Sequence, residues 1–152
     1  MSALDQFLTL TQQQGKINAQ ELEDIFNRLP PAPLDLLRGP WNGGSFDTGH
    51  PIHKRLRSMN WLGKTFHSTE DVDPIVVARD GERVCDEAWG HARLREVKFR
   101  GVISAAMVYD LHPIIDHFRL VTPTMVAGAM DTKVGADLGT YYFYLTKESG
   151  RL

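Results

Sequence analysis

The sequence predicts a mainly β, α+β fold in which N-terminal helices precede an antiparallel β-barrel of about eight strands. Apolar residues follow helical spacing only within residues 1–29. From residue 38 onward, short strand-like segments are separated by Gly, Pro and Asp-Gly turns. Because no helix-length segment separates these strands, parallel crossovers are not expected, and the sheet should curl or close on itself.

An N-terminal helical segment is expected over residues 1–33. Asn18 stands three residues before Glu21, which is the spacing of a helix cap. The prolines of segment 30–33 then end the helix and form a stiff connector. An apolar stripe on the second helix is expected to pack onto the core, although it would also suit a cover for the barrel mouth or a homodimer contact. The stripe consists of Leu22, Ile25, Phe26 and Leu29.

The barrel domain is expected over residues 34–152. Asp80-Gly81 is a hairpin signal. Segment 94–109 is too long for one flat strand, so Gly101 is expected to bend it. The expected strands are 38–46, 57–67, 74–79, 83–88, 94–109, 114–121, 125–132 and 140–147.

Composition excludes several classes of protein. The chain has 152 residues, of which 42% are hydrophobic and 24% charged, a balance that excludes wholesale disorder. Its 17 Lys and Arg against 19 Asp and Glu give a net charge of −2, without the basic excess of a nucleic-acid-binding protein. No apolar stretch is long enough for a membrane helix, and the N-terminus lacks the pattern of a secretory signal. A cytoplasmic protein is therefore expected.

A motif rich in glycine, GPWNGG at residues 39–44, begins the first expected strand. Glycine lets the chain approach closely as it enters a barrel, and the large ring of Trp41 can plug one end. The motif resembles the Gly-x-Trp start of lipocalins, fatty-acid-binding proteins and nitrobindins, which are small barrels that hold a ligand. The resemblance implies a calycin-like barrel and makes Trp41 a candidate ligand-binding residue.

Longer blocks resemble the bacterial GXWXG family and its companion, domain of unknown function 4334, which follows it on the same chain. The resemblance implies two halves, at about residues 20–80 and 90–147, that form one structural unit. The family's name specifies no activity. The blocks are, in order, LRGPWNG (37–43), TGHP (48–51), NWLGKTF (60–66), FRGVISAAMVYD (99–110), PIIDHFR (113–119) and MDTK (130–133).

Ionisable residues gather on the expected strand at 114–121. Strand alternation places Asp116 on one face and His117 and Arg119 on the other. If the second face lines a cavity, His117 and Arg119 would hold the polar head of a ligand, since an arginine fork suits a carboxylate or phosphate. The alternatives are a buried structural pair made by Asp116 or Arg119, and solvent exposure.

The hairpin that follows could bring two carboxylates together. If Pro123-Thr124 form its turn, Asp116 falls opposite Asp131, and the pair could act as acid and base. A slip of one residue removes this dyad. Asp116, His117 and Asp131 are therefore the candidate catalytic residues.

Further candidate ligand-binding residues have simpler alternatives. Lys64 would add a positive charge at the cavity mouth, or it would point outward from a core strand; Arg100 has the same ambiguity. Tyr109 would reach a ligand with its hydroxyl or cap the core. The remaining candidates, which would line the interior or only fill it, are Trp61, Met107 and Met130.

Metal and cofactor signals are weak. His50 and His53 lie in an expected loop without the helical spacing of a zinc site, and no metal site is predicted from them or from His67. The single cysteine, Cys85, excludes an internal disulfide and a cysteine-rich zinc site, and is expected to be a buried small residue. No cofactor is predicted, although a nitrobindin-like barrel could take haem through an axial ligand. The residues considered for that role are Tyr142, Tyr144 and His117.

These features favour a binding protein over an enzyme. The predicted function is binding of a small hydrophobic or amphiphilic, anionic and lipid-like ligand in the barrel cavity. One alternative is an enzyme that uses the Asp/His/Arg cluster for acid–base chemistry on a small molecule. Another is a haem-binding, nitrobindin-like barrel.

Overall fold

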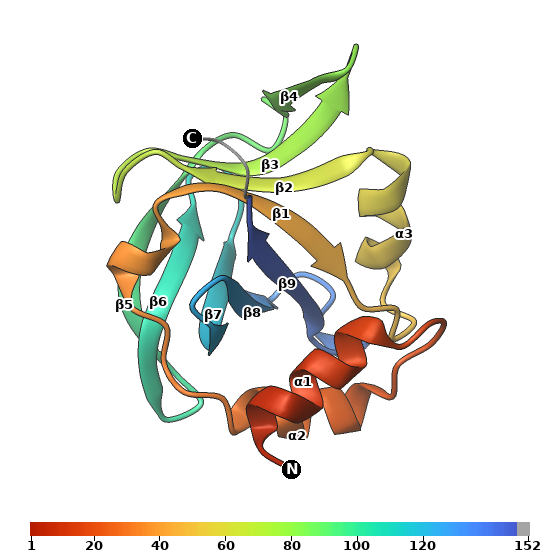
Figure 1. The fold of residues 1–152 in the computed structure, drawn as a ribbon. Coiled ribbons are helices and arrows are strands. Elements are labelled where there is room, and N and C mark those ends of the chain that lie inside the picture. The colour runs from red at the N-terminus through yellow and green to blue at the C-terminus, as the bar shows by residue number, and fades with distance from the viewer. Residues whose placement is uncertain (149–152) are drawn as a thin grey trace.

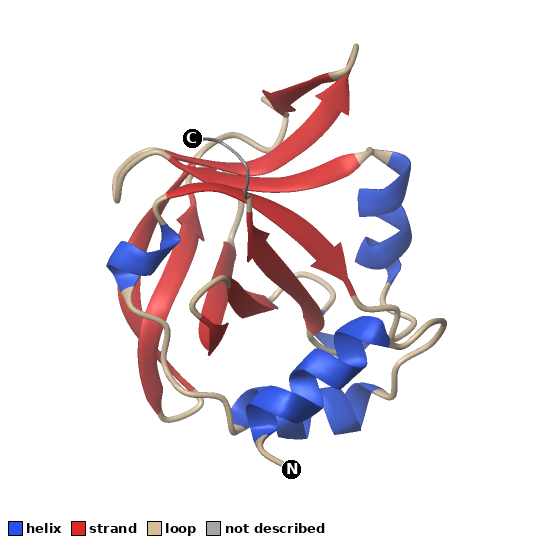
Figure 2. Ribbon diagram, viewed as in Figure 1, coloured by secondary structure: helices blue, strands red, loops and turns tan. Residues whose placement is uncertain are grey.

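In the computed structural model, which describes residues 1–148, eight antiparallel strands close into a barrel with helices packed outside it (Figures 1 and 2). The strands neighbour one another in the order β2-β1-β9-β8-β7-β6-β5-β3, and pairing of β2 with β3 closes the ring. A further strand, β4, extends the sheet beyond β3. The expected calycin-like barrel is therefore confirmed.

The two family-like halves contribute to the same closed sheet. The first supplies β1 to β3 and the second supplies β5 to β9. The helices are α1 (Ala3–Gln12), α2 (Ala19–Asn27) and α3 (Pro51–Ser58), with 3-10 turns η1 (Leu34–Leu37) and η2 (Ala136–Leu138). The strands are β1 (Gly39–Ser45), β2 (Trp61–Phe66), β3 (Val72–Arg79), β4 (Glu82–Cys85), β5 (Ala92–Phe99), β6 (Val102–Tyr109), β7 (Ile114–Thr122), β8 (Met125–Thr132) and β9 (Tyr141–Lys147).

Two sequence-based boundaries were wrong. Segment 94–109 is not one bent strand but the hairpin β5–β6, because Arg100 and Gly101 both have positive φ and make a tight turn. The region before β2, expected to be loop and strand, contains α3. Its N-terminus is capped by His50, whose Nδ1 accepts a hydrogen bond from the Ile52 amide, and Pro51 stands at the first helical position.

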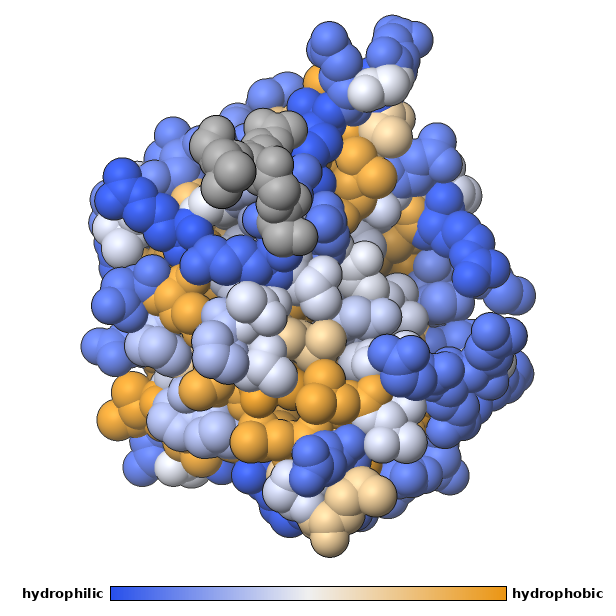
Figure 3. All heavy atoms as spheres, viewed as in Figure 1, coloured by the Kyte–Doolittle hydropathy of each residue, from blue (hydrophilic) through white to orange (hydrophobic). Residues whose placement is uncertain are grey.

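The helices α1 and α2 cover one side of the barrel wall rather than its mouth (Figure 1). The predicted apolar stripe of α2 is buried against outward-facing residues of β8 and β9, such as Ala127 and Tyr142. In Figure 3, hydrophobic residues gather in the lower half of the face, where these helices lie in Figure 1. The helices thus cover the outer surface of one side of the wall. Because side chains alternate between the two faces of each strand, a separate hydrophobic cluster fills the inside of the barrel.

The proline-rich connector completes the wall where β6 and β7 separate. These strands pair directly only from Ala106 to Val108. Beyond that point the Ala105 amide donates to the carbonyl of Ala32, and the Leu120 amide donates to the carbonyl of Pro30. The connector therefore satisfies backbone groups that the open barrel seam would leave unpaired.

Candidate functional site at the barrel mouth

The two ends of the barrel are filled differently. At one end the ring of Trp41 is completely buried among Phe66, Phe118 and Leu145. The Trp41 indole nitrogen donates a hydrogen bond of 2.6 Å to the carbonyl of Leu37. This end is a closed apolar plug, as a Gly-x-Trp motif predicts.

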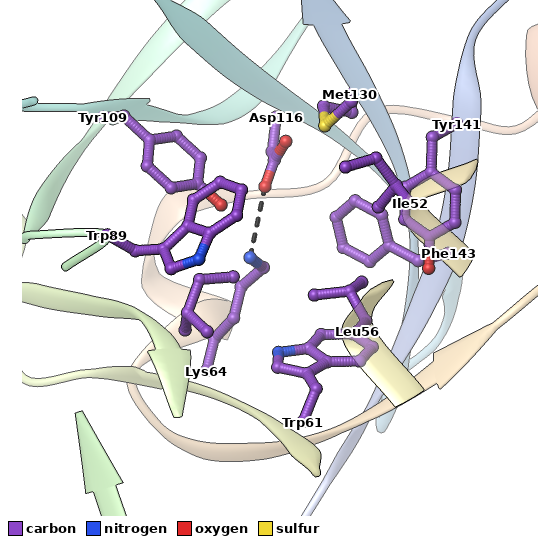
Figure 4. Close-up of a pocket in the computed structure, with 11 residues that line it drawn as sticks. Ile52, Leu56, Trp61, Lys64, Trp89, Tyr109, Asp116, Met130, Tyr141 and Phe143 are labelled. Atoms are coloured by element: carbon purple, nitrogen blue, oxygen red, sulfur yellow. Dashed lines mark ion pairs between the residues drawn. The ribbon is translucent and has the colours of Figure 1, made fainter. Parts of the chain in front are cut away.

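Toward the other end, a buried ion pair crosses the barrel interior. Lys64 from β2 and Asp116 from β7 point toward each other from facing walls (Figure 4), with the Nζ atom 3.2 Å from Oδ2. The Lys64 ammonium also donates to the Pro74 carbonyl at 2.9 Å. Both side chains are at most 3% exposed. Of the two alternatives for Lys64, the outward orientation is excluded, because the strand places it on the inner face.

One hydrogen-bonding atom of the ion pair has no partner. Among the described residues, Asp116 Oδ1 is buried and has no hydrogen-bond partner. Burial raises the pKa of Asp116 and lowers that of Lys64, and each charge partly counteracts the shift of the other. Burial, the nearby Asp116 charge and a side-chain hydrogen-bonding interaction with the Asp116 carboxylate hold the pKa of Tyr109 well above its usual range. A buried carboxylate oxygen without a donor is rare and calls for a physical explanation.

The space beside the ion pair, here called the inner cavity, has a volume of about 20 Å³. That is enough for about one water molecule. Figure 4 shows its walls, which are aromatic and aliphatic apart from the charged pair. The lining residues are Ile52, Leu56, Trp61, Lys64, Ile75, Trp89, Tyr109, Asp116, Met130, Tyr141 and Phe143.

A larger depression, here called the vestibule, lies outside the inner cavity and has a volume of about 280 Å³. Ile52, Trp89 and Met130 line both spaces and therefore separate them. The Arg55 guanidinium lies 5.1 Å from the Trp89 ring centre, a cation–π contact. The other lining residues are His50, Pro51, His112, Pro113, Ile114, Thr132, Val134, Gly135 and Leu138.

A hydrogen-bonded chain leads from the inner cavity to a second surface pocket. The Tyr141 side chain lines the cavity; its hydroxyl lies 2.5 Å from Ser45 Oγ, and Ser45 Oγ lies 2.7 Å from His53 Nδ1. His53 and Arg57 of α3 line this pocket together with Ser45. The chain offers a route by which a proton could pass between cavity and surface.

The structure brings four predicted ligand-binding residues together. Trp61, Lys64, Tyr109 and Met130 all line the inner cavity, and Asp116 joins them. Their strands are far apart in sequence, so only closure of the barrel places them side by side.

Two other predicted ligand-binding residues lie inside the barrel without lining this cavity, although they are the cross-strand partners of Lys64 and Asp116. Trp41 belongs to the apolar plug at the opposite end, and Met107 is completely buried in the interior core. Both side chains fill the barrel interior, and neither lines the inner cavity or the vestibule.

The expectation that Arg119 faces the cavity is wrong. Arg119 points outward from β7 and is covered by the end of α2, with 1% of its surface exposed. Its Nη1 donates to the carbonyls of Phe26, Asn27 and Leu29, and its Nη2 donates to that of Phe99. Arg119 therefore neutralises carbonyls at a helix C-terminus, where a cation is favourable.

His117 also lies on the outer face. Its ring stacks on Phe99 with centres 3.8 Å apart, and its Nε2 is 3.0 Å from Oδ2 of Asp131. Asp131 is partly exposed. His117 and Asp131 thus form a surface pair outside the barrel, so they do not line the inner cavity.

The predicted Asp116–Asp131 dyad does not form. The β7–β8 turn is where it was expected, but a β-bulge after Leu120 shifts the register by one residue. Asp116 lies opposite Met130, and Asp131 lies opposite Ile115. The two carboxylates are therefore on opposite faces of the sheet.

Arg100 also lies outside the barrel interior. From the β5–β6 turn it donates to the Tyr142 hydroxyl and to Asn27 Oδ1, and it forms an ion pair with Glu23 of α2. These contacts fasten α2 to the barrel.

The residues present do not fit the haem alternative. Tyr142 and Tyr144 point outward from β9 and pack with the helices, and His117 is also on the outer face. None of these three candidate axial ligands faces the interior.

The three histidines first considered for a metal take separate partners. His50 caps α3, His53 bonds to Ser45, and His67 Nε2 lies 2.9 Å from Asp73 Oδ2. His50 and His53 stand on a helix, not in the expected loop.

Sequence analysis missed the residues that form the rest of the mouth. Ile52 and Leu56 belong to the unexpected helix α3, and Trp89 lies in the loop before β5. Tyr141 and Phe143 alternate along β9, and that alternation was the available signal.

Comparisons with known proteins agree with this architecture. Residues 24–81 match the family described as GXWXG protein, and residues 90–147 match the domain of unknown function DUF4334. The crystal structure of a protein from Thermomonospora curvata is similar, with 42% sequence identity and a TM-score of 0.91. The match covers 98% of this chain and 100% of that one. No curated protein is significantly similar to the chain. Within residues 1–148, no helix combines the length and apolarity needed to cross a membrane.

Proposed function

Because the chain belongs to the GXWXG family and carries DUF4334 as its second half, names that specify no chemistry, we propose its function from the barrel mouth: binding of a small amphiphilic molecule. The apolar body of the ligand would occupy the vestibule. Its polar group would reach past Trp89 and Met130 to the Lys64–Asp116 pair. The observation that carries this proposal is the unpaired Oδ1 of Asp116 beneath a largely apolar depression.

The size of the two spaces restricts the ligand. The inner cavity holds about one water, so a hydroxyl group fits there and a bulkier head group does not. A hydroxyl can donate to Asp116 Oδ1 and accept from the Lys64 ammonium, replacing both bonds of such a water. The vestibule, at about 280 Å³, lies at the small end of ligand pockets. A short amphiphile therefore fits better than a long-chain lipid.

The charge at the vestibule also contributes to the proposal. Arg119, the expected anchor for an anionic head group, is outside the barrel, but Arg55 stands beside Trp89 at the vestibule. A negative group at the outer end of the ligand would be attracted there. A cytoplasmic location belongs to the same proposal, since a reducing compartment keeps the thiol of Cys85 free.

The test uses one apolar chain with different polar ends: 1-octanol, octanoate and octylamine. Binding is followed by NMR at the three tryptophan indole groups, which are the only ones in the sequence. We expect 1-octanol to shift the signals of Trp61 and Trp89, which line the inner cavity, and to leave Trp41 unchanged. Failure of all three compounds to shift Trp89, or equal shifts of all three tryptophans, would overturn the proposal.

A paired variant tests the role of the ion pair. Lys64→Met combined with Asp116→Leu removes both charges together, so no lone charge stays buried. We expect the wild type to bind 1-octanol more tightly than octanoate or octylamine. In the paired variant, the ratio of these dissociation constants should fall by tenfold or more. Arg93→Met, on the outer side of β5, is the matched control and should keep the preference. An unchanged preference in the paired variant would show that the pair does not contact the ligand.

Acid–base catalysis at the same place is a second candidate. Lys64, Tyr109 and Asp116 all have shifted pKa values, and such groups cluster at catalytic sites. The Tyr141–Ser45–His53 chain would let protons exchange with solvent. Incubation with a metabolite mixture, followed by mass spectrometry, separates the two functions. Turnover by the wild type that is lost in the paired variant supports catalysis, and an unchanged mixture supports binding alone.

A further inference from the structure

A second cluster of reactive side chains lies outside the barrel mouth, beside β3 and β4. It contains Asp73 of β3, Cys85 at the end of β4 and His91 just before β5. One ligand atom from each residue lies within 4.8 Å of the other two. The Nδ1 atom of His91 is 3.2 Å from Oδ1 of Asp73. Cys85, expected to be a buried small residue, is only half-buried and belongs to this cluster.

His67, which follows β2, contacts the Asp73 carboxylate from another side. Its Nε2 lies 2.9 Å from Oδ2 of Asp73. Bond lengths of about 2.0–2.3 Å around a tetrahedral zinc ion place neighbouring ligand atoms roughly 3.5 Å apart. The contacts of His91 and His67 with Asp73, at 3.2 and 2.9 Å, are close to that spacing, and the ligand atoms of Asp73, Cys85 and His91 lie within 4.8 Å of one another. His67 and Cys85 also line one surface pocket, which gives an ion access from solvent.

The surroundings of His91 match those of a histidine that binds metal. While Nδ1 faces Asp73, the other ring nitrogen, Nε2, lies 3.0 Å from Oε2 of Glu87. Metal-binding histidines commonly use a carboxylate in this way to fix the ring and its tautomer. Glu87 therefore supplies the orienting contact that a ligand histidine needs.

We propose that Asp73, Cys85 and His91, with His67 as fourth ligand, form a Zn²⁺ site. Thiolate, imidazole and carboxylate are the groups that zinc binds in proteins. On coordination the Cys85 thiol releases its proton to solvent, and the sulfur binds as thiolate. No redox step is involved, and the ion ties together segments that follow β2, belong to β3, end β4 and precede β5.

The charge around Cys85 supports a cation. Three carboxylates, those of Asp73, Glu87 and Asp86, interact electrostatically with the Cys85 sulfur and make its surroundings negative. A divalent cation reverses this local field and favours the thiolate. The ion would also fix the short loop that carries Trp89, two residues before His91.

The first experiment titrates chelator-treated protein with Co²⁺, which substitutes for zinc and absorbs visible light. We expect one ion per chain and a near-ultraviolet charge-transfer band from sulfur to cobalt. Since Cys85 is the only cysteine, such a band identifies its sulfur as a ligand. Absence of the band at saturating Co²⁺ would overturn the proposal.

Variants of His91, Cys85 and the orienting residue Glu87 are then compared by calorimetric titration with Zn²⁺. We expect His91→Ala and Cys85→Ser to weaken binding by more than a hundredfold, and Glu87→Gln by about tenfold. Glu82→Gln, in the same surface pocket but outside the cluster, should bind as the wild type does. Equal weakening by Glu82→Gln and His91→Ala would show general attraction of cations instead of a site.

The wild-type protein provides a control that does not depend on variant folding. Zn²⁺ should slow alkylation of Cys85 by iodoacetamide at least tenfold, while Mg²⁺, which prefers oxygen ligands, should not. An alkylation rate unaffected by Zn²⁺ contradicts a zinc–sulfur bond.

Discussion

Two charged residues on the same strand, three positions apart, show how differently a barrel can bury charge. Asp116 and Arg119 of β7 are 2% and 1% exposed, one on the inner face and the other on the outer. Arg119 donates to four backbone carbonyls. Asp116 has a cationic partner but one oxygen without a hydrogen bond. A fully bonded buried charge is explained by structure alone, whereas an incompletely bonded one needs a further donor, which a bound water or the proposed ligand would supply.

The largest expected effect comes from breaking the inner pair on one side. Lys64→Met leaves the Asp116 carboxylate buried without its counter-charge and should lower the free energy of unfolding by about 4 kcal/mol at pH 7. The paired change Lys64→Met with Asp116→Leu should recover most of that loss, since replacing a whole buried pair by apolar groups is often neutral. Urea unfolding of the three proteins measures both values. If the paired variant is as unstable as the single one, the ion pair is not the source of the loss.

A somewhat smaller effect is expected on the outer face. Arg119→Met removes the donors that hold the end of α2 and should lower the free energy of unfolding by about 3 kcal/mol. It should leave ligand binding at the mouth unchanged once the protein is folded. Arg93→Met, an exposed arginine of β5, is the control and should change stability by less than about 0.5 kcal/mol. A ligand-binding defect in folded Arg119→Met would contradict the separation of the two faces.

The sequence contained enough information for the barrel but only part of the site. Alternation along the strands and turn residues such as Asp80-Gly81 predict local structure, and these local signals agree with the fold. The same alternation correctly separated Asp116 from Arg119. It could not tell which face is inside, because both faces of β7 are apolar and buried.

The remaining errors come from features that are not periodic. The bulge after Leu120 adds one residue to β7, and no glycine or proline within β7 predicts it. The helix α3 is short and begins with His50, an unusual cap, so its apolar residues Ile52 and Leu56 were missed. The metal cluster depends on strand order, since Asp73 and His91 meet only because β3 pairs with β5.

The next prediction concerns the chain that links the inner cavity to the surface. Ser45→Ala removes the bridge between Tyr141 and His53 and should lower the free energy of unfolding by about 1 kcal/mol. Ser58→Ala, which removes an exposed hydrogen bond to the Arg55 carbonyl, is the control and should cost less. If the second candidate function holds, Ser45→Ala should also slow turnover. Equal stability of the two variants would mean that the short contacts of Ser45 contribute little.

The smallest expected effect is on the pH dependence of stability, because the charge of each member of the inner pair partly counteracts the pKa shift of the other. The raised pKa of Asp116 means that its contribution is fully present below pH 3.8 and is lost as the pH rises through the folded-state pKa. The lowered pKa of Lys64 means that its contribution is present above pH 10.5 and is lost as the pH falls through its folded-state pKa.

Both terms therefore lower wild-type stability in the middle of the pH range. The stability of the paired variant, which has neither group, should therefore compare most favourably with that of the wild type between these limits and less favourably toward each extreme. Urea midpoints measured across the pH range for both proteins test this, with Arg119→Met as a variant that keeps the inner pair. A constant difference between wild type and paired variant at all pH values would mean that the pair titrates as it does in the unfolded chain. The fold would then compensate the charges of the inner pair as fully as water does, and the contrast between Asp116 and the fully bonded Arg119 would lose its physical basis.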